Sequence, residues 1–171
     1  MRRTLVSASI CLFAALAAPS SDADVMVGGM GAPAGSTHPL SQFTSLAQGT
    51  MLPSRQITGP NTQLHEPHFG VYEPNQQLIY ISDFRSQAIR VFPAFASGNV
   101  APLRVINPPL LGQTRANAPV FAHNELGVIA SNCCIATYPL DASGDAVPRI
   151  REVRWGGGAD PTTGLNNPFA L

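Results

Sequence analysis

Histidine and glutamate residues recur at two places in the chain and are the first candidates for chemistry. His65, Glu66 and His68 lie close together, and His123 and Glu125 follow later. Imidazole and carboxylate groups are common ligands of divalent ions, so the two groups could share one metal. No metal-spacing motif accompanies them, and ordinary loop residues are the alternative interpretation. The candidate metal ligands are therefore His68, His123 and Glu125, with no other cofactor indicated and no catalytic residue assigned.

The adjacent pair Cys133 and Cys134 is the second candidate, because an oxidising compartment would favour a disulfide. Neighbouring residues on a strand point to opposite faces, so this bond would need a distorted turn. Such a bond would be strained and easily reduced. Two free or buried thiols are the favoured interpretation, and a bridge between molecules is a further alternative.

The N-terminus has the features of an export signal. Arg2 and Arg3 precede an apolar stretch over residues 5–18, and small residues suitable for cleavage follow it. The stretch is short for a transmembrane helix, so we expect a signal peptide over 1–23 and a periplasmic or secreted protein. Residues 24–39 are rich in Gly and Ala, which predicts a flexible lead-in.

Composition excludes some function classes. The net charge is zero, so nothing favours binding to nucleic acid or to an anionic membrane surface. The chain has 171 residues, enough for one modest domain. Its 16 Pro and 15 Gly residues indicate many turns.

The elements that must position these residues are short strands, and the clearest run spans Leu78–Ile106. Apolar runs over 78–82, 88–92 and 103–106 alternate with polar turns, which predicts an antiparallel meander. Outside this run, strands are predicted over 42–46, 55–58, 69–72, 121–122, 127–131, 135–138 and 150–153.

The same unit recurs along the chain. It consists of Pro-x-Arg-x-Ile/Val, a Gly-rich turn, and Thr-x-Leu-x-x-Pro. Its leading prolines are Pro53, Pro102 and Pro148, separated by 49 and 46 positions. A period of this size with about four strands per unit is typical of a β-propeller blade. The sequence therefore predicts an all-β fold of antiparallel four-stranded blades in an incomplete, open propeller.

The segments IYISDFRSQAIRVF, ASGNVAPLRVI and TTGLNNPFAL resemble NHL-type and related bacterial secreted β-propeller repeats. The resemblance covers about Gln42–Leu171 and implies a split blade over 40–66, blades over 67–118 and 119–167, and the start of a strand over 168–171. It also implies that the His and Glu groups lie near a channel mouth, where propeller hydrolases of the lactonase kind hold a divalent ion.

Two side-chain roles follow from the repeat. Asp83 ends a strand and could be a channel-facing carboxylate, but we expect it to accept hydrogen bonds from turn N–H groups. Arg55, Arg104 and Arg151 or Arg154 belong to the repeat itself, so we expect them to pack or pair between blades.

The number of blades limits the function. About two and a half blades cannot close a ring, and both ends would present uncovered edges. The chain could be a fragment of a longer propeller, a unit that self-associates or takes a partner chain, or another kind of sheet stack. We expect an exported binding or scaffold module that contacts a protein or glycan through blade loops, rather than an enzyme by itself. The alternative is an incomplete or oligomer-completed metal-dependent hydrolase.

Overall fold

The computed structural model describes residues 10–14, 25–29, 38–44, 47–107, 116–122, 124–130 and 134–145. These residues form eleven strands and one short 3-10 helix, η1 (Pro60–Thr62). No helix among them is long and apolar enough to cross a membrane. The strands are β1 (Ile10–Ala14), β2 (Val25–Gly29), β3 (Leu40–Phe43), β4 (Arg55–Ile57), β5 (Pro67–Glu73), β6 (Leu78–Asp83), β7 (Ala88–Pro93), β8 (Arg104–Ile106), β9 (Ala116–Ala122), β10 (Glu125–Ala130) and β11 (Cys134–Pro139).

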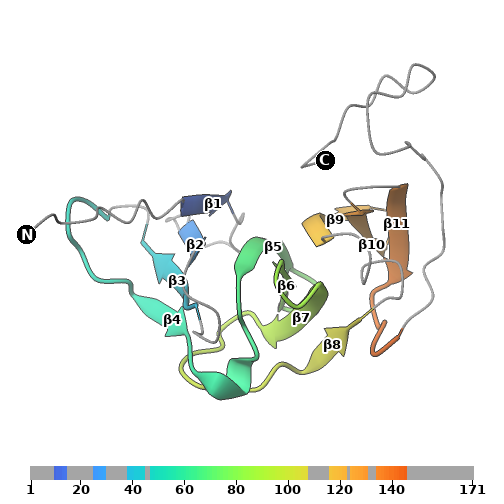
Figure 1. The fold of residues 1–171 in the computed structure, drawn as a ribbon. Helices are drawn as coiled ribbons and strands as arrows, with labels where there is room; N and C mark the ends of the chain where they lie inside the picture. The colour runs from blue at the N-terminus through green and yellow to red at the C-terminus, as the bar shows by residue number, and fades with distance from the viewer. Residues whose placement is uncertain are drawn as a thin grey trace, which may run out of the picture.

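The strands form three antiparallel sheets, which confirms the all-β, antiparallel part of the prediction. The first sheet has the order β1-β2-β3-β4, the second β5-β6-β7-β8, and the third β9-β10-β11. In each sheet the spatial order follows the chain order, so each is a meander. Figure 1 shows the second sheet lying between the first and the third.

The second and third sheets share one hairpin register. β6 and β7 pair from Leu78 with Pro93 to Asp83 with Ala88. β10 and β11 pair in the same way from Glu125 with Pro139 to Ala130 with Cys134. Each residue of one hairpin therefore has a counterpart in the other, as the sequence repeat predicts.

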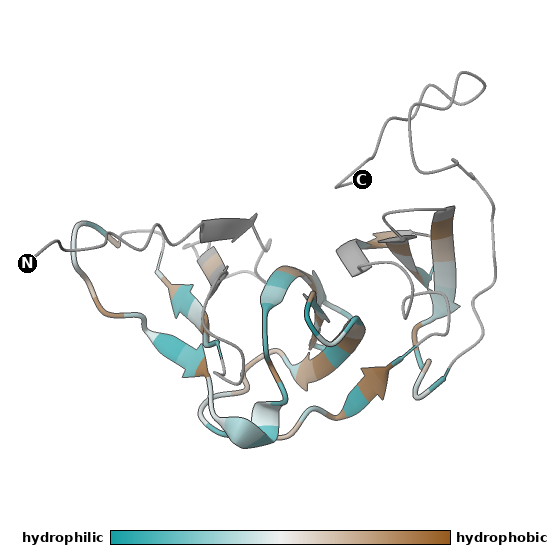
Figure 2. Cartoon of the chain, viewed as in Figure 1, coloured by the Kyte–Doolittle hydropathy of each residue, from teal (hydrophilic) through white to brown (hydrophobic). Residues whose placement is uncertain are grey.

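Two buried clusters hold the sheets together. The cluster between the first and second sheets contains Met26, Leu40, Ile57, Leu64, Ile79, Ile81, Phe92, Ala94 and Ala96. The cluster between the second and third contains Tyr80, Ile89, Val91, Ile106, Leu126, Val128, Ala136, Tyr138 and Ala142. Successive residues of β6 belong to different clusters because side chains alternate across a strand. The second sheet is thus buried on both faces, and hydrophobic residues dominate β7 and β8 in Figure 2.

A parallel backbone bridge links each sheet to the next. Ile57 of β4 bridges to Gly98, and Ile106 of β8 bridges to Gly144. Both glycines follow the third strand of their own sheet and have positive φ, 73° and 60°. Glycine adopts this left-handed conformation without a steric cost from Cβ. The same contact therefore occurs twice, between equivalent parts of neighbouring units.

The stretch over 24–39, predicted as a flexible lead-in, contributes a strand to the first sheet, while the predicted split blade over 40–66 contributes β3 and β4. Val25–Gly29 forms β2 and pairs with β3, so the first sheet has four strands. Its sequence, VMVGG, is short and ends in two glycines, so its intrinsic strand propensity is weak. Hydrogen bonding to β3 stabilises the strand instead.

β1 lies within the predicted signal peptide and pairs with β2. Removal of residues 1–23 during export stays a prediction. The strands predicted over 150–153 and 168–171 lie outside the described residues.

Candidate functional site

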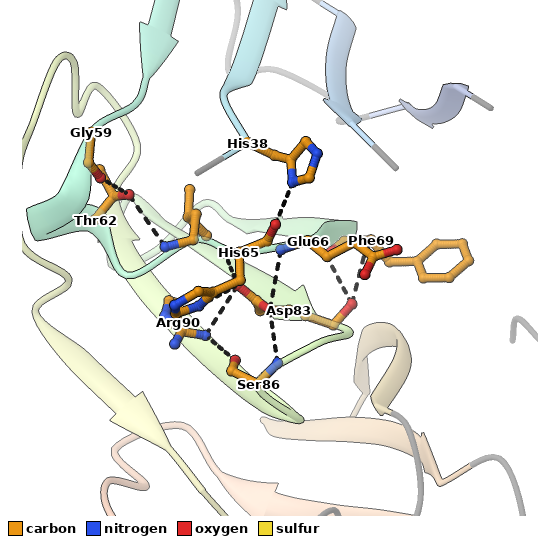
Figure 3. A network of polar contacts seen from close by, with 11 residues as sticks. His38, Gly59, Thr62, His65, Glu66, Phe69, Asp83, Ser86 and Arg90 are labelled. Atoms are coloured by element: carbon orange, nitrogen blue, oxygen red, sulfur yellow. Dashed lines mark hydrogen bonds and ion pairs between the residues drawn. The ribbon is translucent and has the colours of Figure 1, made fainter. Parts of the chain in front are cut away.

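A cluster of polar side chains lies between the first and second sheets (Figure 3). It gathers around the end of β6, the start of β5 and the middle of β7. Its members are His38, His65, Glu66, His68, Asp83, Ser86 and Arg90.

Asp83 is the centre of the cluster and is fully buried. Its Oδ2 accepts the backbone N–H of His65 at 2.6 Å, and its Oδ1 accepts those of Glu66 at 3.3 Å and Ser86 at 3.1 Å. The predicted role of Asp83 as an acceptor for turn N–H groups is confirmed. Two of its three backbone donors come from the segment that enters β5, so Asp83 also fixes the start of that strand.

Arg90 neutralises this carboxylate. Its Nη1 lies 3.3 Å from Asp83 Oδ2 and donates to Ser86 Oγ at 2.5 Å. The side chain is 5% exposed, and its burial lowers the pKa of Arg90 while the Asp83 carboxylate opposes that shift. Burying either charge alone would be costly, so the two groups depend on each other.

His65 and His38 extend the cluster towards the first sheet. The carbonyl oxygen of His65 is hydrogen bonded to Nδ1 of His38, the second residue before β3. The His65 ring is 43% exposed, with Nδ1 3.8 Å from Asp83 Oδ2. The backbone around His65 therefore connects both sheets, while its ring lies partly in solvent.

His68 is enclosed by aromatic side chains. Its ring stacks on Phe84 with centroids 4.2 Å apart and meets Phe69 edge-on at 6.0 Å. Its Nε2 lies 3.5 Å from Glu66 Oε1. The residue is only 6% exposed, which places this candidate ligand inside the packed structure.

The predicted metal site of His68, His123 and Glu125 is not tested. Glu125 begins β10 of the third sheet, and His123 lies outside the described residues. The described part of the chain contains no group of three His, Cys, Asp or Glu residues able to hold a metal ion.

The cysteine pair is likewise untested. Cys134 begins β11 opposite Ala130, and Cys133 lies outside the described residues. The disulfide between them stays a prediction.

Of the repeated arginines, Arg55 contacts the neighbouring sheet, as predicted, whereas Arg104 contacts Tyr80 of its own sheet. The guanidinium of Arg55 on β4 lies 5.7 Å from the Phe95 ring centroid, beyond the end of β7. Arg104 on β8 donates to the Tyr80 hydroxyl at 3.0 Å, and that hydroxyl donates to the carbonyl of Leu140, after β11, at 2.8 Å. Arg151 and Arg154 lie outside the described residues.

Sequence inspection missed Arg90 as a member of the site. The run Ala-Ile-Arg-Val-Phe looks like a strand with one polar, solvent-facing residue. The nearby Asp83 at the end of the preceding strand was the available signal, since the hairpin brings both to one face. The Asp83 carboxylate is occupied by backbone N–H groups and by Arg90, which leaves it little capacity for acid–base chemistry.

Comparison with known proteins adds no family: no protein-family model matches the chain, and no curated protein is significantly similar to it.

Proposed function

We propose that this chain is an exported module of β-propeller-type blades that binds a protein partner through loops at the outer ends of its sheets, and that it is not an enzyme by itself. The observation that carries the blade interpretation is the repeated bridge, Ile57 with Gly98 and Ile106 with Gly144. A four-stranded meander that repeats its register and its link to the next sheet is the unit from which propellers are built.

Exposed apolar side chains support the binding role. Met51, Leu52, Phe95 and Leu103 are 55%, 86%, 72% and 58% exposed. All four lie in segments that lead into β4 or β8, the last strands of the first two sheets. Phe95 also has Arg55 above its ring. Aromatic and arginine side chains are enriched in protein interfaces, which favours a protein over a glycan as the partner.

Photo-crosslinking tests this proposal. A photoreactive phenylalanine analogue at Leu52 or at Phe95 should capture a discrete protein from the exported fraction. The same analogue at Gln76, an exposed position in the β5–β6 turn, is the control. Adducts that form equally at Gln76, or that resist protease because they are glycan, would refute a protein partner bound through these loops.

The alternative is a metal-dependent hydrolase, which the approach of His68 Nε2 to Glu66 Oε1 at 3.5 Å favours. Metal analysis of the purified protein tests it. Stoichiometric Ca²⁺ or Zn²⁺ that is lost in a His68→Gln variant would support the hydrolase, and failure to bind either ion would count against it.

A further inference from the structure

The two interfaces between sheets use one set of positions. In the first interface, Leu40 and Ile57 of the first sheet meet Ile79, Ile81 and Phe92 of the second. The second interface uses the equivalent positions. Ile89 and Ile106 of the second sheet correspond to Leu40 and Ile57, and they meet Leu126, Val128 and Tyr138 of the third sheet. Each sheet therefore has a forward face, which packs on the following sheet, and a backward face, which packs on the preceding one.

Among the described residues, each of the two outermost sheets has one face that no other sheet covers. These are the backward face of the first sheet and the forward face of the third. On the backward face of the first sheet, Phe43 holds the position of Phe92 and is only partly buried. On the forward face of the third sheet, Ile135 holds the position of Ile89 and is also partly buried. Their counterparts inside the stack are fully buried. The two faces therefore carry the two halves of an interface that the chain already makes twice.

The glycine that makes the backbone bridge between neighbouring sheets also occurs in the first unit, at one end of the stack. Gly49, with φ 61°, corresponds to Gly98 and Gly144. Those two glycines donate to Gln56 and Val105 at 2.7 Å and accept from Thr58 and Asn107 at 3.0 and 2.8 Å. The described residues place no such strand beside Gly49, which is exposed. In the third unit, the sequence carries Pro148 and Val153 where the bridging strands have Pro102 and Ile106.

We propose that a second copy of this chain covers these faces, with the backward face of one first sheet packing on the forward face of another third sheet. One chain cannot join its own two faces, because the second sheet separates the first from the third (Figure 1). The contact is heterologous, so it builds a ring or an open row of copies instead of a symmetric dimer.

Polar groups fit this contact. Gln56 Nε2 donates to Ser41 Oγ at 2.9 Å, so both side chains beside Phe43 have a partner before the second copy arrives. Burying polar groups that are already hydrogen bonded costs less free energy than burying polar groups without a partner. The contact rests on the blade stacking of the proposed function, but it uses surfaces other than Leu52 and Phe95.

Two single variants and their mixture test the assembly in the full chain. Sedimentation velocity should show wild-type oligomers that grow with concentration. Phe43→Arg and Ile135→Arg should each be monomeric, since each destroys one of the two faces. An equal mixture of the two variants should form a one-to-one heterodimer, because each supplies the face that the other lacks. Gln76→Arg, at an exposed position in the β5–β6 turn away from both faces, is the control and should assemble as wild type.

Circular dichroism and urea unfolding must show that both variants are folded. Some loss of stability in either variant is acceptable, because a heterodimer in the mixture shows that the remaining face of each variant is intact. A wild type that stays monomeric at all concentrations would overturn the proposal. An Ile135→Arg variant that dimerises alone would do so too, because it would indicate a symmetric contact between first sheets. If the copies assemble but no crosslinks form at Leu52 and Phe95, only the proposed partner binding is rejected, and the assembly stands.

Discussion

Arg90 Nη1 lies 3.3 Å from Asp83 Oδ2 on the face of the second sheet that meets the first, and the two side chains are 5% and 0% exposed. At the corresponding positions of the third sheet, the residues are Ala136 and Ala130. The ion pair is therefore not required by the blade pattern, and it belongs to this one interface.

Breaking the pair from one side should destabilise the fold strongly. Arg90→Met leaves the Asp83 carboxylate buried without a cation, and we expect a loss of about 3 kcal/mol in the free energy of unfolding. Urea unfolding at neutral pH measures the change. Arg85→Met, in the exposed turn beside it, is the control and should change stability by less than about 0.5 kcal/mol.

A double-mutant cycle with Asp83→Asn separates the pair from its surroundings. If the two residues act as one unit, the double variant should lose clearly less than the sum of the single losses. Additive losses would mean that Asp83 acts through its backbone donors alone.

Two buried tyrosines should respond oppositely to loss of their hydroxyl groups. Tyr138 occupies the position of Phe92, and its hydroxyl has no hydrogen-bond partner among the described residues. Tyr138→Phe should therefore raise the free energy of unfolding by about 1 kcal/mol, because it removes an unpaired polar group. Tyr80→Phe should lower it by about 1 kcal/mol, since that hydroxyl binds Arg104 and Leu140. Urea unfolding of both variants tests the contrast, and equal shifts would contradict it.

The same tyrosines should make the fold sensitive to alkali. Burial raises the pKa of Tyr138 and of Tyr80 above the usual tyrosine value. A raised pKa in the folded state contributes stability that is fully present below the unfolded pKa of about 10, and this contribution is lost progressively as pH rises from that value to the raised folded-state pKa. The midpoint of urea unfolding should fall above about pH 10, and less steeply in Tyr138→Phe. Identical slopes in the variant and wild type would exclude Tyr138 as a source.

Much of this architecture was predictable because it is local and repeated. Strands such as Leu78–Asp83 contain a short apolar run and are bounded by turns, and the repeat indicates which runs are equivalent. Asp83 could be placed correctly because an aspartate after a strand commonly accepts turn N–H groups. These features depend on residues close in sequence.

Features that depend on a distant strand or on a neighbouring sheet were not predictable. β2 has a Gly-rich sequence, and its pairing with β3 makes it a strand. Arg90 looks like a surface residue of β7 until the first sheet covers that face. The burial of the Tyr138 hydroxyl, which has no hydrogen-bond partner within the described ranges, likewise follows from the packing of the third sheet on the second. In each case the deciding neighbour lies in another strand or another sheet.

Two glycines should differ in their tolerance of a side chain. Gly98 has φ 73°, and a Cβ there would meet no atom within 4 Å. Gly98→Ala should therefore cost only the left-handed backbone penalty, about 1 kcal/mol. Gly59 has φ 118°, and its Cβ would lie 2.5 Å from Asn99 Oδ1. Gly59→Ala should cost about 3 kcal/mol, because strain and a clash add. Gly59→Ala combined with Asn99→Ala should recover part of the loss, and no recovery would refute the clash.

Removal of residues 1–23 should leave the sheet stack folded. β1 is an edge strand that pairs only with β2 in the described part of the chain. The buried residues that the first sheet contributes to its interface, Met26, Leu40 and Ile57, all follow the predicted cleavage region. The chain over 24–171 should therefore keep the far-ultraviolet circular dichroism of a β protein and a cooperative urea transition. Its transition should be shifted modestly, because β2 becomes the edge.

Mass spectrometry of the exported protein should find this shortened chain. Full-length protein in the exported fraction, or a shortened chain that does not fold, would show that β1 is part of the mature module.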